Sequence, residues 1–548
     1  MYVGFIKRHM PRLLSQVNRD ADLITYGSCD RNYWHQSIRD FSSAILQQAC
    51  LSLALVWRTD FPGNIWYGSA NVREWAAAAL RYMGKIQLPD GSFNEYYPNE
   101  HSFPATAFNL FAGCRAYRLL ELGDEEVLAT LGRAADWLCA HDETKTCNQQ
   151  AAAIAGLYRF YGMTGRREIL EAAERKLEAL LALYSQEGWF PEQGGADIGY
   201  SSVTLDMLTE VYEESGDGRL RSVLGGMVDF LSHFVHPDGT IGGEYGSRNT
   251  VYFLPSGLET CVRLGIRRET ASAMIDRLFG KDAGESFMDS VDDRYLSHYV
   301  MHSFLRALAG YTPRKPSPEK LPYETIHSRY YPEAGLMTRC TGAYYAVVSL
   351  RKGGLVKVYR GDEEVLNDCG YRVPWGKGRT AVTNWLNPDL AGRCEGDSLE
   401  ISGRMTLVKP RTQNPRYHVL LRLAALVRGA RLRDDIKRMT IFQKASCSVR
   451  FARKVTFLPD GVRIRDTIDN PTGRAVLRAP NVSLRLVASA KFFSRSDLLP
   501  YGRENYGAAR RLSVVRSLRI RDGKAEVTEE AEREDAAIRA GGAAERRG

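Results

Sequence analysis

The chain has 548 residues, more than one hydrophobic core usually serves, so at least two domains are expected. Hydrophobic residues make up 44% and charged residues 25%, as in ordinary globular proteins, and the formal net charge of +9 suits an anionic partner. No zinc-finger spacing or ribonucleoprotein motif accompanies this charge, so a nucleic-acid partner is not expected.

Residues 1–30 form an N-terminal segment without a visible export signal. Its basic residues follow a short apolar run, whereas a signal peptide carries them before a longer one, so we expect a cytoplasmic protein. The longest apolar stretch, residues 44–57, contains polar residues and is too short to span a bilayer. The ten cysteines show no metal-binding spacing and are expected to be reduced and mostly buried. No cofactor is expected, and a structural metal in the later domain stays open.

Residues 31–310 carry a succession of helical patterns, with Asn71 as one expected helix cap. The helices are expected at 37–57, 71–85, 105–120, 125–139, 149–161, 168–184, 202–213, 220–234, 256–264, 268–278 and 292–308. A turn with glycine and aromatic residues recurs at Gly91, Gly188 and Gly239, with gaps of 97 and 51 residues. A further copy of the loop, without glycine, lies near residue 142, so the period is close to fifty residues. We therefore predict an (α/α) toroid of helical hairpins whose polar loops gather at one end.

The pattern changes after a proline-rich linker at 311–325. Residues 326–500 contain short alternating runs, expected as strands at 344–350, 355–359, 419–423, 449–457 and 462–468. Many strands without intervening helices predict an antiparallel β-sandwich. Residues 501–548, rich in Arg, Glu and Ala, are expected to be a flexible polar tail.

Two phrases, one beginning at Asn148 and one ending at Tyr200, together with this layout, resemble the heparinase II/III-like polysaccharide lyases and their alginate-lyase relatives over roughly residues 30–490. In that family a helix begins with Asn-His, and the catalytic Tyr follows some fifty residues later. Here Asn148 precedes Tyr200 by 52 residues, and Gln149 takes the place of the His. The family's His-rich strand early in the sandwich has no counterpart at 344–359; the histidines of the predicted sandwich are His327 and His418.

The resemblance implies β-elimination on an acidic, uronic-acid-containing poly- or oligosaccharide. Asn148 and Gln149 would supply amide donors to the substrate carboxylate, and Tyr200 would move the proton, with His101 as a second proton carrier. Each residue also has a plainer explanation: Asn148 as a helix cap, Tyr200 as a packing residue and His101 as a backbone partner.

Further residues of the polar loops are candidates for binding the substrate. They are Trp66, Tyr67, Glu95, Trp189, Glu192, Asp197, Glu244, Tyr245 and Arg248. Two alternatives remain open. The carboxylates among them suit a glycoside hydrolase, and the aromatic rings suit a catalytically inactive carbohydrate-binding or capsule-related protein.

Overall fold

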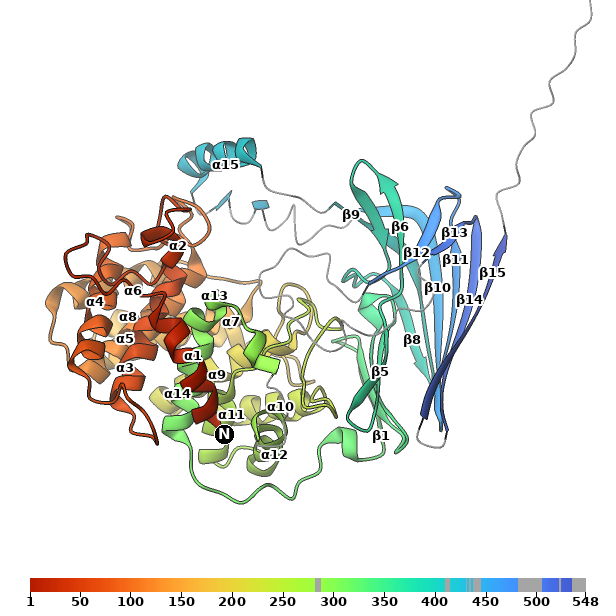
Figure 1. Cartoon of the computed structure of the whole chain (residues 1–548), viewed down its shortest axis with the longest axis horizontal. Helices are drawn as coiled ribbons and strands as arrows, with labels where there is room; N and C mark the ends of the chain where they lie inside the picture. The colour runs from red at the N-terminus through yellow and green to blue at the C-terminus, as the bar shows by residue number, and fades with distance from the viewer. Residues whose placement is uncertain are drawn as a thin grey trace, which may run out of the picture. The chain divides into compact units, whose positions relative to one another are not determined.

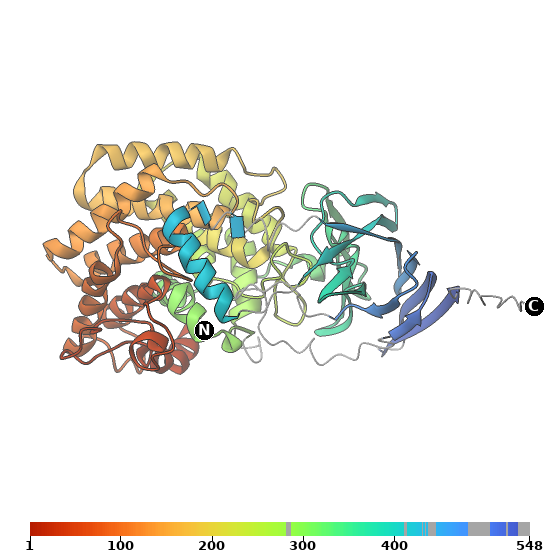
Figure 2. The same ribbon diagram turned by 90° about the horizontal axis from the view of Figure 1, so that it is seen from above.

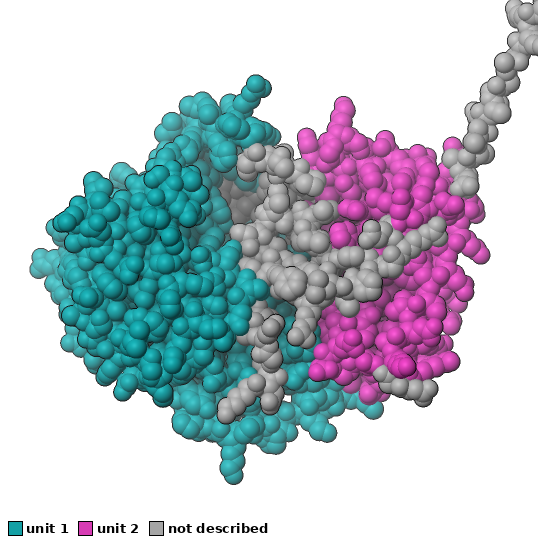
Figure 3. All heavy atoms as spheres, in the orientation of Figure 1, with its two compact units in different colours: residues 1–326, 412–442, 485–494 teal, residues 327–411, 443–484, 495–548 magenta. Residues whose placement is uncertain are grey.

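The computed structural model describes residues 1–280, 287–409, 414–429, 431–432, 435–436, 445–480, 505–521 and 524–534. Its chain divides into two compact units (Figure 3). The helical unit contains residues 1–326 together with the insertion 412–442, and the strand unit begins at His327. A helix-rich N-terminal region is thus followed by antiparallel sheets, as predicted.

Six helices form the inside of the helical unit, and each contacts the next around a closed cycle (Figure 1). They are α3 (Ala49–Arg58), α5 (Phe103–Leu120), α7 (Cys147–Thr164), α9 (Ile198–Ser215), α11 (Pro255–Arg263) and α14 (Met301–Gly310). The cycle closes because α14 contacts α3. Most residues of α5, α7 and α9 are buried, which is typical of helices surrounded by other helices.

An outer helix pairs with each inner helix. The outer helices are α1 (Tyr2–Leu14), α4 (Ala70–Ile86), α6 (Glu125–Ala140), α8 (Arg167–Leu181), α10 (Arg219–Ser232) and α12 (Arg268–Phe279). The sequence pattern had not indicated α1, which packs on α14 through a stack of the Phe5 and Phe304 rings at 3.9 Å. The first helix of the chain therefore completes the last hairpin.

Several helix starts differ from the expected ones. The expected helix 37–57 begins only with a 3₁₀ turn, η1 (Ala44–Gln48), that leads into α3. Ser69, and not Asn71, caps α4, because the Ser69 hydroxyl accepts a hydrogen bond from the Val72 amide at 3.5 Å. The short helices α2 (Arg31–Trp34) and α13 (Asp293–Tyr295) lie in loops, and a π-helical turn, η3 (Leu296–Val300), leads into α14.

The repeated glycines allow the loops to rest on the outer helices. Gly91 has φ +92°, and a Cβ there would collide with the Arg133 carbonyl on α6. Gly188 has φ +98°, and a Cβ there would collide with the Gly226 carbonyl on α10. Each turn thus needs both a left-handed backbone and no side chain, which explains why glycine recurs at this place.

An ionic cluster fills the interior near the ends of the inner helices. The Glu210 carboxylate pairs with Arg115, with Arg159 at 2.5 Å and with Arg306 at 2.9 Å. Burial raises the pKa of Glu210, but the three guanidinium groups outweigh it, and the net shift is downward.

The strand unit contains two antiparallel sheets. The five-stranded sheet runs in chain order through β1 (His327–Tyr331), β2 (Leu336–Cys340), β3 (Tyr345–Ser349), β4 (Leu355–Arg360) and β5 (Glu363–Asp368). The ten-stranded sheet consists of β6 (Tyr371–Gly376), β7 (Arg379–Val382), β8 (Ala391–Glu395), β9 (Ser398–Val408), β10 (Ser446–Leu458), β11 (Gly461–Asp469), β12 (Ala475–Arg478), β13 (Asn505–Ala508), β14 (Arg511–Arg521) and β15 (Lys524–Glu534). Val348 and Val358 of the first sheet share one buried core with Ile401 and Val455 of the second.

Two expectations for this part of the chain were wrong. Residues 419–423 belong to helix α15 (Pro415–Arg428) and not to a strand, because the Asn414 side chain caps the helix and Pro415 stands in its first turn. Residues 505–534 carry three strands where a flexible tail was expected. Residues 481–500 and 535–548 lie outside the described part of the chain. No helix among the described residues is long and apolar enough to cross a bilayer.

Candidate active site

The loops that precede the inner helices gather at one end of the helical unit, which we call the polar end. The Ala44 amide donates to the Asn94 carbonyl at 3.0 Å, so the loops before α3 and α5 touch. The Ser247 amide donates to the Ala196 carbonyl at 2.8 Å, so the loops before α9 and α11 touch. Glu95, Asn148, Tyr200 and Glu244 therefore stand at the same end.

Asn148 and Glu192 form a buried pair within the polar end. Glu192 is fully buried, and its carboxylate accepts hydrogen bonds from the Asn148 amide nitrogen at 2.8 Å and from the Asn148 side chain at 2.7 Å. The Thr204 hydroxyl donates to the same carboxylate at 3.3 Å. Burial raises the pKa of Glu192 well above its ordinary value, although the Asn148 donors oppose the shift. Asn148 thus links the start of α7 to the next loop, while Thr146 is the residue before the helix.

Asp197 fixes the start of α9 beneath Tyr200. Its carboxylate accepts from the Tyr200 amide at 3.2 Å and from the Arg248 amide at 2.8 Å, and the Thr250 hydroxyl donates to it as well. The Arg248 guanidinium donates to the Gln193 side chain, and both residues are buried. Asp197 and Arg248 therefore stabilise the loops around Tyr200 from below.

Tyr200 is partly exposed and borders a group of phenols. Its ring meets that of Tyr252 edge to face at 6.2 Å, and the Tyr299 hydroxyl donates to the Tyr252 hydroxyl at 2.7 Å. Tyr252 and Tyr299 are buried, and burial raises the pKa of both well above the ordinary value. Tyr200 is therefore the partly exposed member of a phenol cluster whose buried members, Tyr252 and Tyr299, keep their protons at neutral pH.

Arg294 adds a cation that the sequence analysis missed. Its guanidinium pairs with Glu95 at 2.6 Å and lies 4.8 Å from the centre of the Tyr96 ring, which is 59% exposed. Burial lowers the pKa of Arg294, but Tyr96 and Glu95 raise it by more, so the net shift is upward and the guanidinium keeps its positive charge. The polar run before the last inner helix, Asp292 to Tyr295, was the available signal, because it occupies the same place as the loops before the other inner helices.

His101 is held by its own loop. Its Nδ1 lies 2.6 Å from the Asp90 carboxylate and 3.0 Å from the Ser92 hydroxyl. Trp137 of the outer helix α6 donates to the same Asp90 carboxylate at 3.1 Å. These contacts connect His101 to the outer layer of helices and not to the phenol cluster.

The aromatic candidates are not exposed together at the polar end. Trp66 and Tyr67 lie between α3 and α4, where the inner helix ends, because hairpin loops alternate between the two ends. Trp189 and Tyr245 do lie at the polar end, but they are only 5% and 2% exposed. The Trp189 indole donates to Glu187 at 3.0 Å, and the Tyr245 hydroxyl lies 2.9 Å from His236 Nε2. The four rings therefore do not form one exposed surface on which a sugar chain could stack.

The carboxylates of the candidate set are also buried. Glu95, Glu192, Asp197 and Glu244 are each at most 5% exposed. Within the described residues, no three His, Cys, Asp or Glu side chains gather closely enough to hold a metal ion. Tyr200, Gln149 and Arg294 are partly exposed at the polar end and Tyr96 is exposed, and these groups suit proton transfer and the binding of an anion.

No protein-family model and no curated protein sequence matches the chain. Its fold is nevertheless found in solved structures. The chondroitin AC lyase of Streptomyces coelicolor A3, solved with chondroitin sulphate, aligns over 87% of this chain and 67% of its own, with a TM-score of 0.56 and 10% identity. A Paenibacillus xanthan lyase aligns over 87% of this chain but 46% of its own, so the chain spans less than half of that enzyme; the TM-score is 0.54 and the identity 10%. Heparinase III aligns over 98% of this chain and 87% of its own, at a TM-score of 0.48 and 9% identity. The fold is that of polysaccharide lyases of known structure.

Proposed function

We propose that this protein is a polysaccharide lyase that cleaves an acidic, uronic-acid-containing poly- or oligosaccharide by β-elimination. On this proposal the closed cycle of helices is the (α/α) toroid, the two sheets are the β-sandwich, and the polar end binds the sugar chain. The observation that carries the proposal is the position of Tyr200: a partly exposed phenol at the start of an inner helix, fixed from below by Asp197.

The reaction removes the proton from C5 of the uronate and breaks the bond between C4 and the bridging oxygen. A C4–C5 double bond forms, and the bridging oxygen takes up a proton as the new chain end. Tyr200, in its phenolate form, accepts the C5 proton and then supplies a proton to the leaving oxygen, so one residue serves as base and acid. The proton balance closes without a cofactor.

The C5 proton is acidic enough only when the neighbouring carboxylate is neutralised. Arg294 supplies a permanent positive charge next to the exposed Tyr96 ring, and Gln149 supplies an amide donor at the start of α7. Asn148 keeps a second N–H on the amide that holds Glu192. The proposal assigns carboxylate binding to Arg294 and Gln149, and Asn148, which is 3% exposed, positions the start of α7 beside them.

The burial of the loop carboxylates favours the lyase over a glycoside hydrolase. A hydrolase needs two carboxyl groups that reach the scissile bond from opposite sides. Glu192 is fully buried and bonded to Asn148, and Asp197 is fully buried as the cap of α9. Both serve the loops themselves, so neither is placed to act as the acid or the base of a hydrolase.

One observation favours the inactive, sugar-binding alternative. Gln149 stands where the heparinase II/III-like family carries a histidine. The two histidines of residues 326–500, His327 and His418, do not lie in the strand where that family carries its histidines. His327 lies 3.1 Å from the Thr338 hydroxyl in the five-stranded sheet, and His418 stands on α15. A protein without a second proton carrier would bind the polymer and leave it intact.

The test is an incubation with a panel of acidic polysaccharides, in which a lyase releases unsaturated ends that absorb in the near ultraviolet. Tyr200→Phe should lower kcat by about a hundredfold to ten-thousandfold with little change in KM, because only the transition state uses the hydroxyl. Tyr252→Phe is the matched control: it removes a buried phenol from the same cluster and should retain most of the activity. New reducing ends without ultraviolet absorbance would indicate a hydrolase, and full activity of Tyr200→Phe would refute the assigned role.

A further inference from the structure

Helix α15 presents an apolar face to solvent. Val419, Leu420, Leu423, Leu426 and Val427 recur at helical spacing, and each is between 56% and 87% exposed. We call these five residues the outer face. Monomeric proteins rarely leave such a contiguous aliphatic surface uncovered.

The opposite side of α15 already has a partner. Ala425 and Leu432 are buried together with Tyr97, and Leu421 packs against the same cluster. Arg422 pairs with Asp40 of the helical unit at 2.8 Å. In Figure 2 α15 is drawn in front of the helical unit, and its partners Tyr97 and Asp40 belong to loops of that unit. The helix is therefore fixed with its outer face directed away, and a helix that is apolar on both sides normally has both sides covered.

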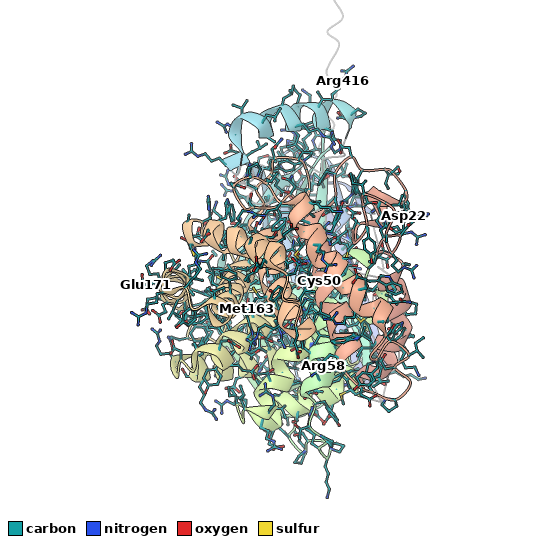
Figure 4. All side chains as sticks on the ribbon, turned by 90° about the vertical axis from the view of Figure 1, so that its left-hand side faces the viewer. Asp22, Cys50, Arg58, Met163, Glu171 and Arg416 are labelled. Carbon is teal, nitrogen blue, oxygen red and sulfur yellow. The ribbon has the colours of Figure 1, made fainter. Side chains whose placement is uncertain are left out.

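The charge of the chain is concentrated in the same segment. Residues 409–444 contain ten Lys or Arg and two Asp, a formal charge of +8, whereas the whole chain carries +9. α15 itself carries Arg416, Arg422 and Arg428 and no acidic residue. Figure 4 shows Arg416 at the margin of the molecule, on this helix. Exposed leucines and three arginines thus occur together in one 14-residue helix, within a segment that carries most of the net charge.

We propose that α15 docks this protein on an anionic lipid surface. The outer face would enter the boundary between headgroups and acyl chains, and Arg416, together with the positive charge of the segment, would be attracted by the acidic headgroups, as in other interfacial helices. A second copy of the chain offers an apolar face but would bring two +8 segments together. An acidic polysaccharide offers charge but no aliphatic surface. A bilayer with acidic headgroups supplies both.

The experiment uses the full chain and two kinds of vesicle, one of phosphatidylcholine alone and one of phosphatidylcholine with phosphatidylglycerol in equal amounts. We expect flotation with the anionic vesicles, a partition coefficient about tenfold lower on the neutral ones, and weaker binding at high salt. The triple variant Leu420→Ser, Leu423→Ser, Leu426→Ser should lower the partition coefficient by about a hundredfold or more. The control variant Leu23→Ser, Ile24→Ser, Ile65→Ser changes three exposed aliphatic residues elsewhere and should bind within about twofold of the parent.

The melting temperature of both variants is measured in solution first. If the triple variant does not fold, Val427→Asp, at a position 87% exposed, replaces it. The proposal is overturned if the parent does not bind anionic vesicles or if the triple variant binds as well as the parent. It is also overturned if light scattering shows a dimer that the triple variant abolishes, or if binding to an acidic polysaccharide, and not to vesicles, depends on the outer face.

Discussion

Asn148→Asp tests the buried pair that joins the start of α7 to the next loop. The substitution keeps the size of the side chain but replaces the donor that lies 2.7 Å from Glu192 with a second carboxyl group. Two carboxylates at hydrogen-bonding distance in a buried site cannot both be ionised, so one must keep its proton in the folded state.

The expected loss in free energy of unfolding follows from the cost of keeping one carboxyl group protonated at neutral pH. A carboxyl group with an ordinary pKa near 4, kept protonated at pH 7.5, costs about 5 kcal/mol at about 1.4 kcal/mol per pKa unit. A hydrogen bond between the acid and the carboxylate returns about 1 kcal/mol. We therefore expect the free energy of unfolding to fall by about 3 to 5 kcal/mol at pH 7.5. The folded variant binds one proton more than the unfolded chain above about pH 4, so its stability rises as the pH is lowered.

The measurement is urea unfolding followed by helical circular dichroism at pH 5 and pH 7.5. Asn148→Ala should cost about 1 to 3 kcal/mol, since it leaves Glu192 with one donor fewer but adds no second carboxyl group. Gln149→Glu is the matched control, because it adds the same charge one residue further on at a partly exposed position, and it should cost less than about 1 kcal/mol. If Asn148→Asp is no less stable than Asn148→Ala at both pH values, Glu192 does not face Asn148 in the protein.

Three further predictions concern the helical unit. Glu210→Gln removes the carboxylate shared by three arginines and should cost about 3 to 5 kcal/mol in the same unfolding assay; a loss below about 1 kcal/mol would contradict the cluster. His302 is buried, its Nε2 has no hydrogen-bond partner among the described residues, and burial and a nearby arginine hold its pKa well below 6.5. The unfolded chain therefore binds more protons, so stability should fall as the pH drops below about 6.5, and His302→Gln should flatten that slope in a pH series of unfolding curves. Gly91→Ala should cost more than about 3 kcal/mol, because the new Cβ would collide with the α6 carbonyl. Gly123 also has a positive φ but has open space around it, so Gly123→Ala should cost about 1 to 2 kcal/mol. Equal melting temperatures of the two variants would refute this account.

The helical hairpins could be predicted because each helix shows its own apolar period and each repeated turn shows a glycine. The first helix could not be recognised as part of the ring from its position in the chain. Tyr2, Phe5, Ile6 and Met10 do have helical spacing and are buried, but only closure of the ring explains what they pack against. A local pattern predicts a helix, but it does not show that α1 packs on α14, which lies about 300 residues later in the chain.

The C-terminal strands were missed because their charge hid a period of two. In β14, Leu512, Val514 and Leu518 point inward at alternate positions, with Arg516 between them. Arg516 is 1% exposed and pairs with Asp368 of β5, so the strand buries a charged residue with its partner. Composition alone favours disorder for such a segment, and the alternation was the better signal.

The candidate site shows the same limit for carboxylates. Asp197 stands three residues before Tyr200, a spacing that fits a substrate ligand and a helix cap equally well. The structure shows the cap, with both carboxylate oxygens taken by backbone amides. The sequence shows that an acidic residue lies near the site, but only the folded structure shows whether its oxygens already accept hydrogen bonds.

These buried bonds affect how a change in turnover is interpreted for any variant of the polar end. Glu95 holds the loop of Arg294, Glu192 holds Asn148, and Asp197 holds both Tyr200 and the next loop, so neighbouring loops are bonded in pairs. Loss of one carboxylate would displace Tyr200 without touching the substrate, and turnover would fall although the carboxylate moves no proton. A slow Glu192 variant is therefore no evidence for a hydrolase. Tyr200→Phe leaves every one of these bonds in place, because Asp197 holds the Tyr200 amide and not its hydroxyl, so a loss of turnover in that variant with unchanged stability isolates the chemical step.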